Sequence, residues 1–221
     1  MFPLKDHEPS GIFPLFTILI IIACGIVLGL QMTSGNPETF TYKWSLVPTQ
    51  INFLEFSTLI AFITSMFLHG GLFHFLSNMW FLWIFGDNVE ASLGKLGFML
   101  FYITGGVIAG LVQYFFLIGQ NVPILGASGA IAAVLGFYLI NFPNSRVETL
   151  IAYPFITITE LPSKLILSLW FLTQIFNGSV SIVDSAAATG VAWWAHIGGF
   201  AFGCIVGIIF KSNKNRYGEI L

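Results

Sequence analysis

Apolar runs of helix length follow one another through most of this sequence, and they limit the folds open to the chain. The first run, 12–30, contains no charged residue, and a helix needs about 20 mainly apolar residues to cross a bilayer. Charged residues make up only 8% of the chain, whereas soluble domains carry about 25%. We therefore expect an integral, multi-pass membrane protein.

The runs predict an all-α polytopic membrane protein with six transmembrane helices in one membrane domain, 12–210, flanked by short tails, 1–11 and 211–221. Segment 31–65 combines polar residues with many phenylalanines, so we expect a loop in the membrane interface, where aromatic side chains favour the headgroup level. The prolines near 144–163 predict an irregular or short extended connector. The expected spans are 12–30, 66–85, 97–118, 124–141, 164–177 and 191–210.

The positively charged residues predict the orientation of these spans. Short loops rich in Lys and Arg stay on the cytoplasmic side of a membrane. With both termini cytoplasmic, only Lys43 falls in an outer segment. The second, fourth and sixth spans then enter from the outer face, so their N-terminal ends lie in the outer half of the membrane. The inner segments hold Lys5, Lys95, Arg146, Lys164, Lys211, Lys214 and Arg216.

The fourth expected span begins with a turn of small residues around one serine, Ser128. Gly126 and Gly129 flank it and several alanines follow, so a neighbouring helix can approach this backbone closely. Such a pattern is common in membrane helices as a packing surface alone. It also differs from the G-x-S-x-G elbow of soluble hydrolases, because Ala130 stands where the last glycine would be. A catalytic interpretation of Ser128 therefore depends on partners elsewhere in the chain.

Three polar side chains lie at about the same expected depth as Ser128. His196 is between one and two turns into the sixth span, while His74 and Asn78 are two to three turns into the second span and share a helix face. Polar groups within the membrane are costly and usually face an interior or a water-filled cavity. Alone, His196 could bond a backbone carbonyl near the interface and Asn78 could join two helices. Together they indicate one site, whereas His69 is off the shared face and is expected at the water interface.

Glycines explain how the serine and the histidine could meet. Gly199, Gly203 and Gly207 repeat every four residues after His196, which gives a bare groove that can take the small-residue face of the fourth span. This packing brings His196 within reach of Ser128. A neutral imidazole could then take the hydroxyl proton and make the serine a nucleophile that forms a covalent acyl intermediate.

The negative oxygen of such an intermediate needs hydrogen-bond donors, each worth about 3–4 kcal/mol of barrier. The expected donors are the backbone N–H of Ser128, near the positive end of its helix, and the side chains of His74 and Asn78. No carboxylate lies in the outer half of the second, fourth or sixth span, so we expect a Ser-His dyad. No metal or other cofactor is expected, because no H-E-x-x-H or carboxylate–histidine grouping occurs. The net charge of −2 gives no indication of a nucleic-acid partner.

Taken in order, three motifs that cover nearly the whole chain resemble those of the rhomboid intramembrane serine proteases. The combination is far more specific than any one of its parts. The motifs are His-Gly-Gly-Leu-Phe-His with Asn78 and Gly86 following (69–86), Gly-Ala-Ser-Gly (126–129) and Ala-His-Ile-Gly-Gly with Gly203 following (195–203).

The resemblance implies a rhomboid-type six-helix bundle with the fourth span held short in its centre. It implies Ser128 as nucleophile, His196 as general base and acid, and His74 and Asn78 in the oxyanion site. It further implies water reaching the site from the outer face, and endopeptidase cleavage of single-pass membrane proteins in or near the outer end of their helices.

Two features of the sequence depart from the family pattern. The aromatic residue that some rhomboids carry four positions after the serine, where it packs on the catalytic histidine, is Ala132 here. His196 is then held by another group or is less constrained. The Trp-Arg pair that many members show ahead of the second span is replaced by Ile60 and Ala61, which predicts a different anchor for the interfacial loop.

Two other functions stay open at this point. One is a catalytically inactive rhomboid relative that binds membrane helices without cutting them, and the other is a small transporter or channel. The clustering of the polar residues toward one side of the membrane disfavours the transporter. The expected partners are transmembrane protein substrates and the lipid bilayer, with no indication of the oligomeric state. The short, unadorned chain suggests a prokaryotic plasma membrane, with the active site opening to the outer face.

Overall fold

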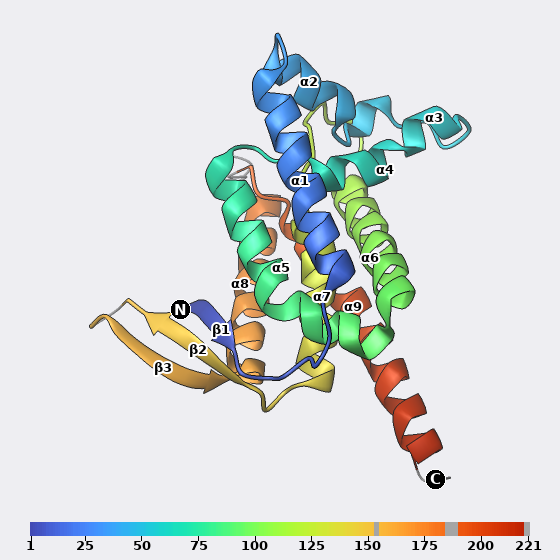
Figure 1. The fold of residues 1–221 in the computed structure, drawn as a ribbon. Coiled ribbons are helices and arrows are strands. Elements are labelled where there is room, and N and C mark those ends of the chain that lie inside the picture. The colour runs from blue at the N-terminus through green and yellow to red at the C-terminus, as the bar shows by residue number, and fades with distance from the viewer. Residues whose placement is uncertain (153–154, 184–189, 219–221) are drawn as a thin grey trace.

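The computed structural model describes residues 1–152, 155–183 and 190–218 and is mainly helical (Figure 1). Four of the described helices are long and apolar enough to cross a membrane: α1 (Leu15–Thr33), α6 (Lys95–Phe116), α8 (Ser163–Val183) and α9 (Trp193–Gly218). A fifth candidate joins α5 (Leu72–Leu93) to the short helices before it across an 83° bend. The expectation of a helical, multi-pass membrane protein is confirmed at this level of four or five candidate spans.

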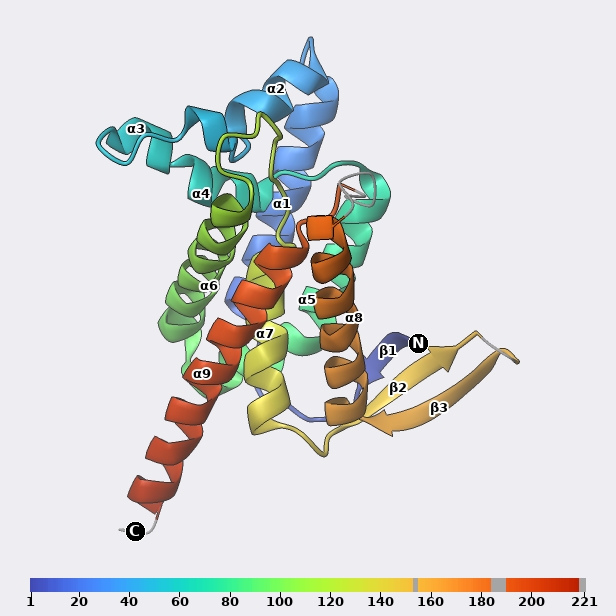
Figure 2. The same ribbon diagram turned by 180° about the vertical axis from the view of Figure 1, so that it is seen from behind.

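A short helix, α7 (Ser128–Asn141), lies in the middle of the bundle. Every residue from 129 to 138 is buried, and α5, α6, α8 and α9 all contact α7, with α9 making the most extensive contact. Figure 2 shows α7 beside α8 and α9. At 14 residues, α7 is too short to cross a bilayer, which needs about 20, and its middle is enclosed by the surrounding helices while both ends are partly exposed.

The contact between α7 and α9 is a direct approach of two backbones. A methyl group added at Gly199 would lie 2.1 Å from the carbonyl oxygen of Gly129, and one at Gly203 would lie 1.9 Å from the carbonyl oxygen of Ala133. Neither position can carry a side chain without moving the helices apart. These two glycines therefore set the distance at which α9 presents its first turn to the start of α7.

Several helix boundaries differ from the expected spans. α5 begins at Leu72 instead of 66, because Gly71 adopts a φ of +147° that breaks the helix ahead of it. α7 begins at Ser128 instead of 124. α8 covers 163–183 and is therefore longer than the expected 164–177, while α9 continues to Gly218 where a separate tail, 211–221, was expected.

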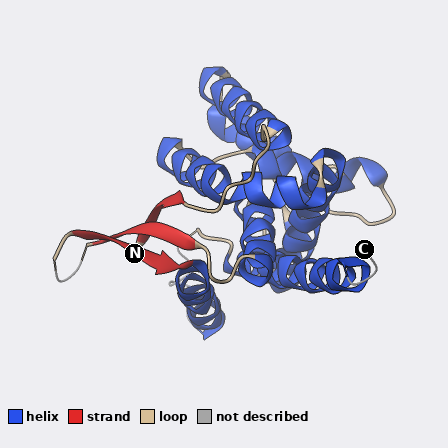
Figure 3. Ribbon diagram, turned by 60° about the horizontal axis from the view of Figure 1, so that its bottom comes forward, coloured by secondary structure: helices blue, strands red, loops and turns tan. Residues whose placement is uncertain are grey.

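The expectation of an all-α chain and an N-terminal tail is wrong in one respect, because three strands form an antiparallel sheet in the order β1-β2-β3. They stand to one side of the helices (Figure 3). The Asp6 carboxylate fixes the first strand by accepting hydrogen bonds from Tyr138 Oη (2.5 Å), Asn88 Nδ2 (2.8 Å) and Ser145 Oγ (2.9 Å). The strands are β1 (Phe2–Asp6), β2 (Arg146–Ile151) and β3 (Thr157–Pro162).

Short helices form segment 31–65 and lie across the end of the bundle opposite the C-terminus (Figure 1). Phe62 anchors this segment, because its side chain is only 4% exposed and its ring centroid lies 6.3 Å from that of Tyr114 on α6. Thr64 Oγ1 adds a hydrogen bond to the Trp44 carbonyl oxygen (2.8 Å). The helices are α2 (Pro37–Trp44), η1 (Pro48–Gln50), α3 (Phe56–Leu59), α4 (Ala61–Thr64) and η2 (Ser65–Phe67).

A buried carboxylate, Glu90 of α5, joins this helix to the start of α1. Its side chain is 0% exposed, and its two oxygens accept hydrogen bonds from the backbone N–H of Phe16, the backbone N–H of Thr17 and the Thr17 hydroxyl, all at 2.9 Å. The first N–H groups of a helix have no partner within the helix, and a carboxylate there also complements the helix dipole. Glu90 thus acts as the N-terminal cap of α1.

We expect Glu90→Gln to lower the free energy of unfolding by roughly 2–4 kcal/mol, because the amide offers one acceptor oxygen and turns an NH2 group toward donors. Thermal unfolding of the purified protein in detergent measures this effect. Glu55→Gln, an exposed glutamate outside the bundle, is the matched control and should change little. Equal melting temperatures for the two variants would contradict a capping role for Glu90.

Candidate active site

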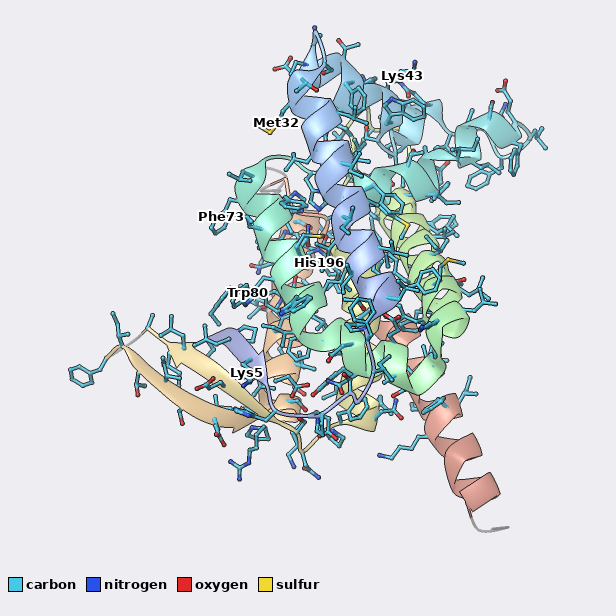
Figure 4. The ribbon with its side chains drawn as sticks, in the orientation of Figure 1. Lys5, Met32, Lys43, Phe73, Trp80 and His196 are labelled. Carbon is cyan, nitrogen blue, oxygen red and sulfur yellow. The ribbon has the colours of Figure 1, made fainter. Side chains whose placement is uncertain are left out.

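Ser128 and His196 meet where α7 and α9 begin. Ser128 is the first residue of α7 and His196 lies in the first turn of α9. The Ser128 Oγ atom lies 2.8 Å from His196 Nε2, within hydrogen-bonding distance. Only 8% of His196 is exposed. Figure 4 shows His196 among the helices, whereas Phe73 and Trp80 point outward from α5.

A third polar group, Gln174 of α8, contacts the other side of the imidazole ring. Its Oε1 atom lies 2.8 Å from His196 Nδ1, and its side chain is 5% exposed. The ring of Trp170, one turn earlier on α8, lies 5.8 Å from the His196 ring between centroids. These α8 residues contact the histidine where Ala132 supplies no aromatic ring.

Sequence reasoning missed Gln174, although a signal was present. A glutamine near the end of an apolar span is a costly residue that usually faces a protein interior. The fifth expected span runs from the inner to the outer face, so its C-terminal end lies at the depth of Ser128. Applying the depth argument to this span as well would have included Gln174 among the candidates.

His74 and Asn78 lie on α5 and line a cavity of about 420 Å³ together with Ser128 and His196. The Asn78 side chain is 7% exposed, and its Nδ2 atom is buried without a hydrogen-bond partner among the described residues. Buried amides are nearly always hydrogen-bonded. Asn78 therefore brings to the wall of the cavity a donor that no described group uses.

The protonation of His74 follows from its neighbour. The backbone N–H of Gly70 donates to His74 Nδ1 at 3.2 Å, so this nitrogen accepts and a neutral ring carries its proton on Nε2. A methyl group added at Gly126 would lie 3.0 Å from that Nε2 atom, and the φ of Gly126 is +124°. Glycine at 126 therefore keeps the space between the His74 N–H and Ser128 open.

The backbone N–H of Ser128 lies at the start of α7, where the first N–H groups of a helix have no intrahelical partner. The helix dipole adds partial positive charge at the same end. A negatively charged oxygen bound beside Ser128 would thus meet this N–H as well as side-chain donors from α5. Chemically, the arrangement offers a hydroxyl, a base within reach of it and donors suited to an oxyanion.

The prediction that His69 lies at the water interface is wrong. Its side chain is only 2% exposed, and its ring centroid lies 5.3 Å from that of His74. Gln31 of α1 holds the His69 backbone in this position, since Oε1 accepts from the N–H (3.0 Å) and Nε2 donates to the carbonyl oxygen (3.1 Å). His69 thus packs behind His74.

A short helix enclosed by longer ones, with a serine and a histidine paired at its start, defines a class of helical membrane proteins with a buried polar site. Residues 57–213 match the family described as Rhomboid domain. The chain therefore belongs to the rhomboid family, and the resemblance found in its motifs is confirmed.

Curated relatives give the same family. The chain is 32% identical over 149 residues to "Presenilin-associated rhomboid-like protein, mitochondrial" of Homo sapiens. This alignment covers 64% of this chain and 35% of the relative. It is 41% identical over 87 residues to "Rhomboid-like protein 11, chloroplastic" of Arabidopsis thaliana, covering 39% and 30%. For "RHOMBOID-like protein 6, mitochondrial" of Arabidopsis thaliana the identity is 30% over 151 residues, covering 66% and 42%. The matched region thus spans less than half the length of each of these relatives.

These names overturn one expectation from the sequence. The relatives are called mitochondrial or chloroplastic, so they point to an organellar membrane and the expectation of a prokaryotic plasma membrane is wrong. Chain length was a poor guide to location, because it carries no targeting chemistry.

Proposed function

We propose that this protein is an intramembrane serine endopeptidase that cuts single-pass membrane proteins in or near the end of their transmembrane helices. The observation that carries the proposal is the 2.8 Å approach of Ser128 Oγ to His196 Nε2 beside a cavity that also holds the unpartnered Asn78 amide. A serine next to a base is the arrangement that nucleophilic catalysis needs. Membership of the rhomboid family, which includes serine proteases, supports the same chemistry.

In the proposed reaction, Ser128 Oγ attacks the carbonyl carbon of a peptide bond while its proton passes to His196 Nε2. The carbonyl oxygen becomes negative and accepts hydrogen bonds from the Ser128 N–H and from the side chains of His74 and Asn78. The C–N bond then breaks as His196 returns the proton to the leaving nitrogen. Water attacks the resulting acyl-enzyme and loses a proton to His196. His196 then gives this proton to Ser128 Oγ as the Oγ–C bond breaks, which releases the carboxylic acid and restores the Ser128 hydroxyl.

The wider arrangement is part of the proposal. We infer that α7 completes a six-helix membrane domain as a short central helix, and that both termini lie on the face opposite the active site. The positive charges counted in the sequence support this orientation. The names of the relatives support an organellar membrane. The substrates would enter the cavity from the lipid and the water from the face where α7 begins.

The proposal is tested by reconstituting the protein into liposomes with a panel of single-pass membrane proteins and locating the ends of any fragments by mass spectrometry. We expect cleavage within or beside a transmembrane segment, and none with Ser128→Ala. Ser92→Ala is the matched control, because among the described residues its hydroxyl bonds only to the Asn88 carbonyl oxygen within α5. Fragments that persist with Ser128→Ala would overturn the proposal, while substrate binding without cleavage would favour an inactive helix-binding relative.

A further inference from the structure

The side-chain amide of Gln174 is held at both ends. Its Nε2 atom lies 3.0 Å from the Trp170 carbonyl oxygen and 3.0 Å from Thr173 Oγ1, while Oε1 faces His196 Nδ1 at 2.8 Å. A carbonyl oxygen can only accept a hydrogen bond, so the end of the amide that faces Trp170 must be the NH2 group. The amide oxygen, which is itself only an acceptor, is thereby directed at the imidazole.

The position of the imidazole proton follows from this orientation. An acceptor 2.8 Å from Nδ1 requires hydrogen on that nitrogen, and a neutral imidazole carries only one N–H. His196 Nε2 is then unprotonated, with its lone pair toward Ser128 Oγ. The opposite tautomer would place the lone pairs of Nδ1 and of the amide oxygen against each other. Both side chains are at least 90% buried, so water cannot easily relieve that repulsion.

We propose that Gln174 is a positioning residue for the reaction: its amide oxygen keeps the His196 proton on Nδ1 and leaves Nε2 free to take the proton of Ser128. This inference rests on the proposed function. It extends the Ser-His pair to a Ser-His-Gln triad in which the third group is neutral and takes up no proton. Because Gln174 belongs to α8, the orientation of the base also depends on the packing of α8 against α9.

Two substitutions separate positioning from packing. Gln174→Met keeps the length of the side chain and removes the acceptor, so we expect kcat to fall about 10- to 100-fold with little change in KM. Gln174→Glu keeps an acceptor oxygen toward His196 Nδ1 at the same reach, but its second oxygen then faces the Trp170 carbonyl oxygen, so it should recover only part of the wild-type kcat. Thr149→Val is the control, since Thr149 is also buried, at 0% exposed, and its hydroxyl donates to the Val147 carbonyl oxygen within β2, away from the site. It should leave kcat per folded molecule unchanged.

A spectroscopic measurement reads the tautomer without relying on activity. ¹⁵N NMR of the protein labelled at histidine distinguishes a nitrogen that carries hydrogen from one that does not. The chain has four histidines, so the His196 signals are identified by their loss in His196→Asn. We expect the wild type to carry hydrogen on Nδ1 alone, and Gln174→Met to show a mixture of the two tautomers.

The outcomes are decisive for the inference. A wild-type His196 that carries its proton on Nε2 would overturn it even if every variant failed to fold. So would a Gln174→Met protein with unchanged tautomer and kcat. Failure of this inference can be told apart from failure of the proposed function. If the proposed function is wrong, the wild type cuts no substrate. If only this inference is wrong, the wild type still cuts and the cleavage does not depend on Gln174.

Discussion

Removing either member of the Ser128–His196 pair is expected to lower kcat by at least about four orders of magnitude, and removing both is expected to lower it no further. The reason is that each residue acts only through the other: the base has no hydroxyl to deprotonate without Ser128, and the hydroxyl is a weak nucleophile without His196. The two atoms lie 2.8 Å apart, so the coupling is direct.

Single-turnover cleavage by Ser128→Ala, His196→Asn and the double variant in the same liposomes measures this effect. Ser92→Ala serves again as the control for expression and reconstitution. Losses that multiply in the double variant would show that the two residues act independently. The proposed proton transfer between them would then be wrong.

Replacing Asn78 with leucine is expected to lower kcat about 10²- to 10³-fold, as loss of an oxyanion donor does, without lowering the melting temperature. Leucine has the branched shape of asparagine but a larger volume, and the adjacent cavity of about 420 Å³ leaves room for it. The Asn78 Nδ2 atom makes no hydrogen bond among the described residues, and a buried donor without a partner lowers folding stability instead of adding to it. In Asn78→Leu, kcat should therefore fall while the melting temperature does not.

Parallel measurement of kcat, KM and thermal unfolding for Asn78→Leu checks this prediction. A normal asparagine that joins two helices would behave in the opposite way, with a lower melting temperature and nearly unchanged kcat. That pattern would assign Asn78 to helix packing and remove it from the oxyanion site.

The sequence predicts the helices and much of the candidate site because both depend on simple periodicities. Apolar runs of about 20 residues specify spans, and the spacing of Gly199 and Gly203 specifies where two backbones come together. The equal depths of Ser128 and His196 follow from counting residues along helices of known rise. None of these inferences requires knowledge of how one helix is rotated against another.

The features that were missed depend on long-range geometry. The strand β1 pairs with β2 across most of the chain, and its position is fixed by Asp6 meeting Tyr138 and Ser145. Residue counting could have placed Gln174 at the depth of the site, but its contact with His196 depends on the rotation of α8 against α9. The burial of His69 likewise depends on Gln31 reaching across from α1.

The central claim is that Ser128 is an activated nucleophile, and labelling by a fluorophosphonate tests it most directly. The purified, folded protein is treated with the probe, and the modified peptide is located by mass spectrometry in wild type, Ser128→Ala and His196→Asn. We expect modification of Ser128 in the wild type and its loss in both variants. A folded wild type that stays unlabelled by several such probes, or labelling of Ser128 that survives without His196, would contradict the proposed mechanism.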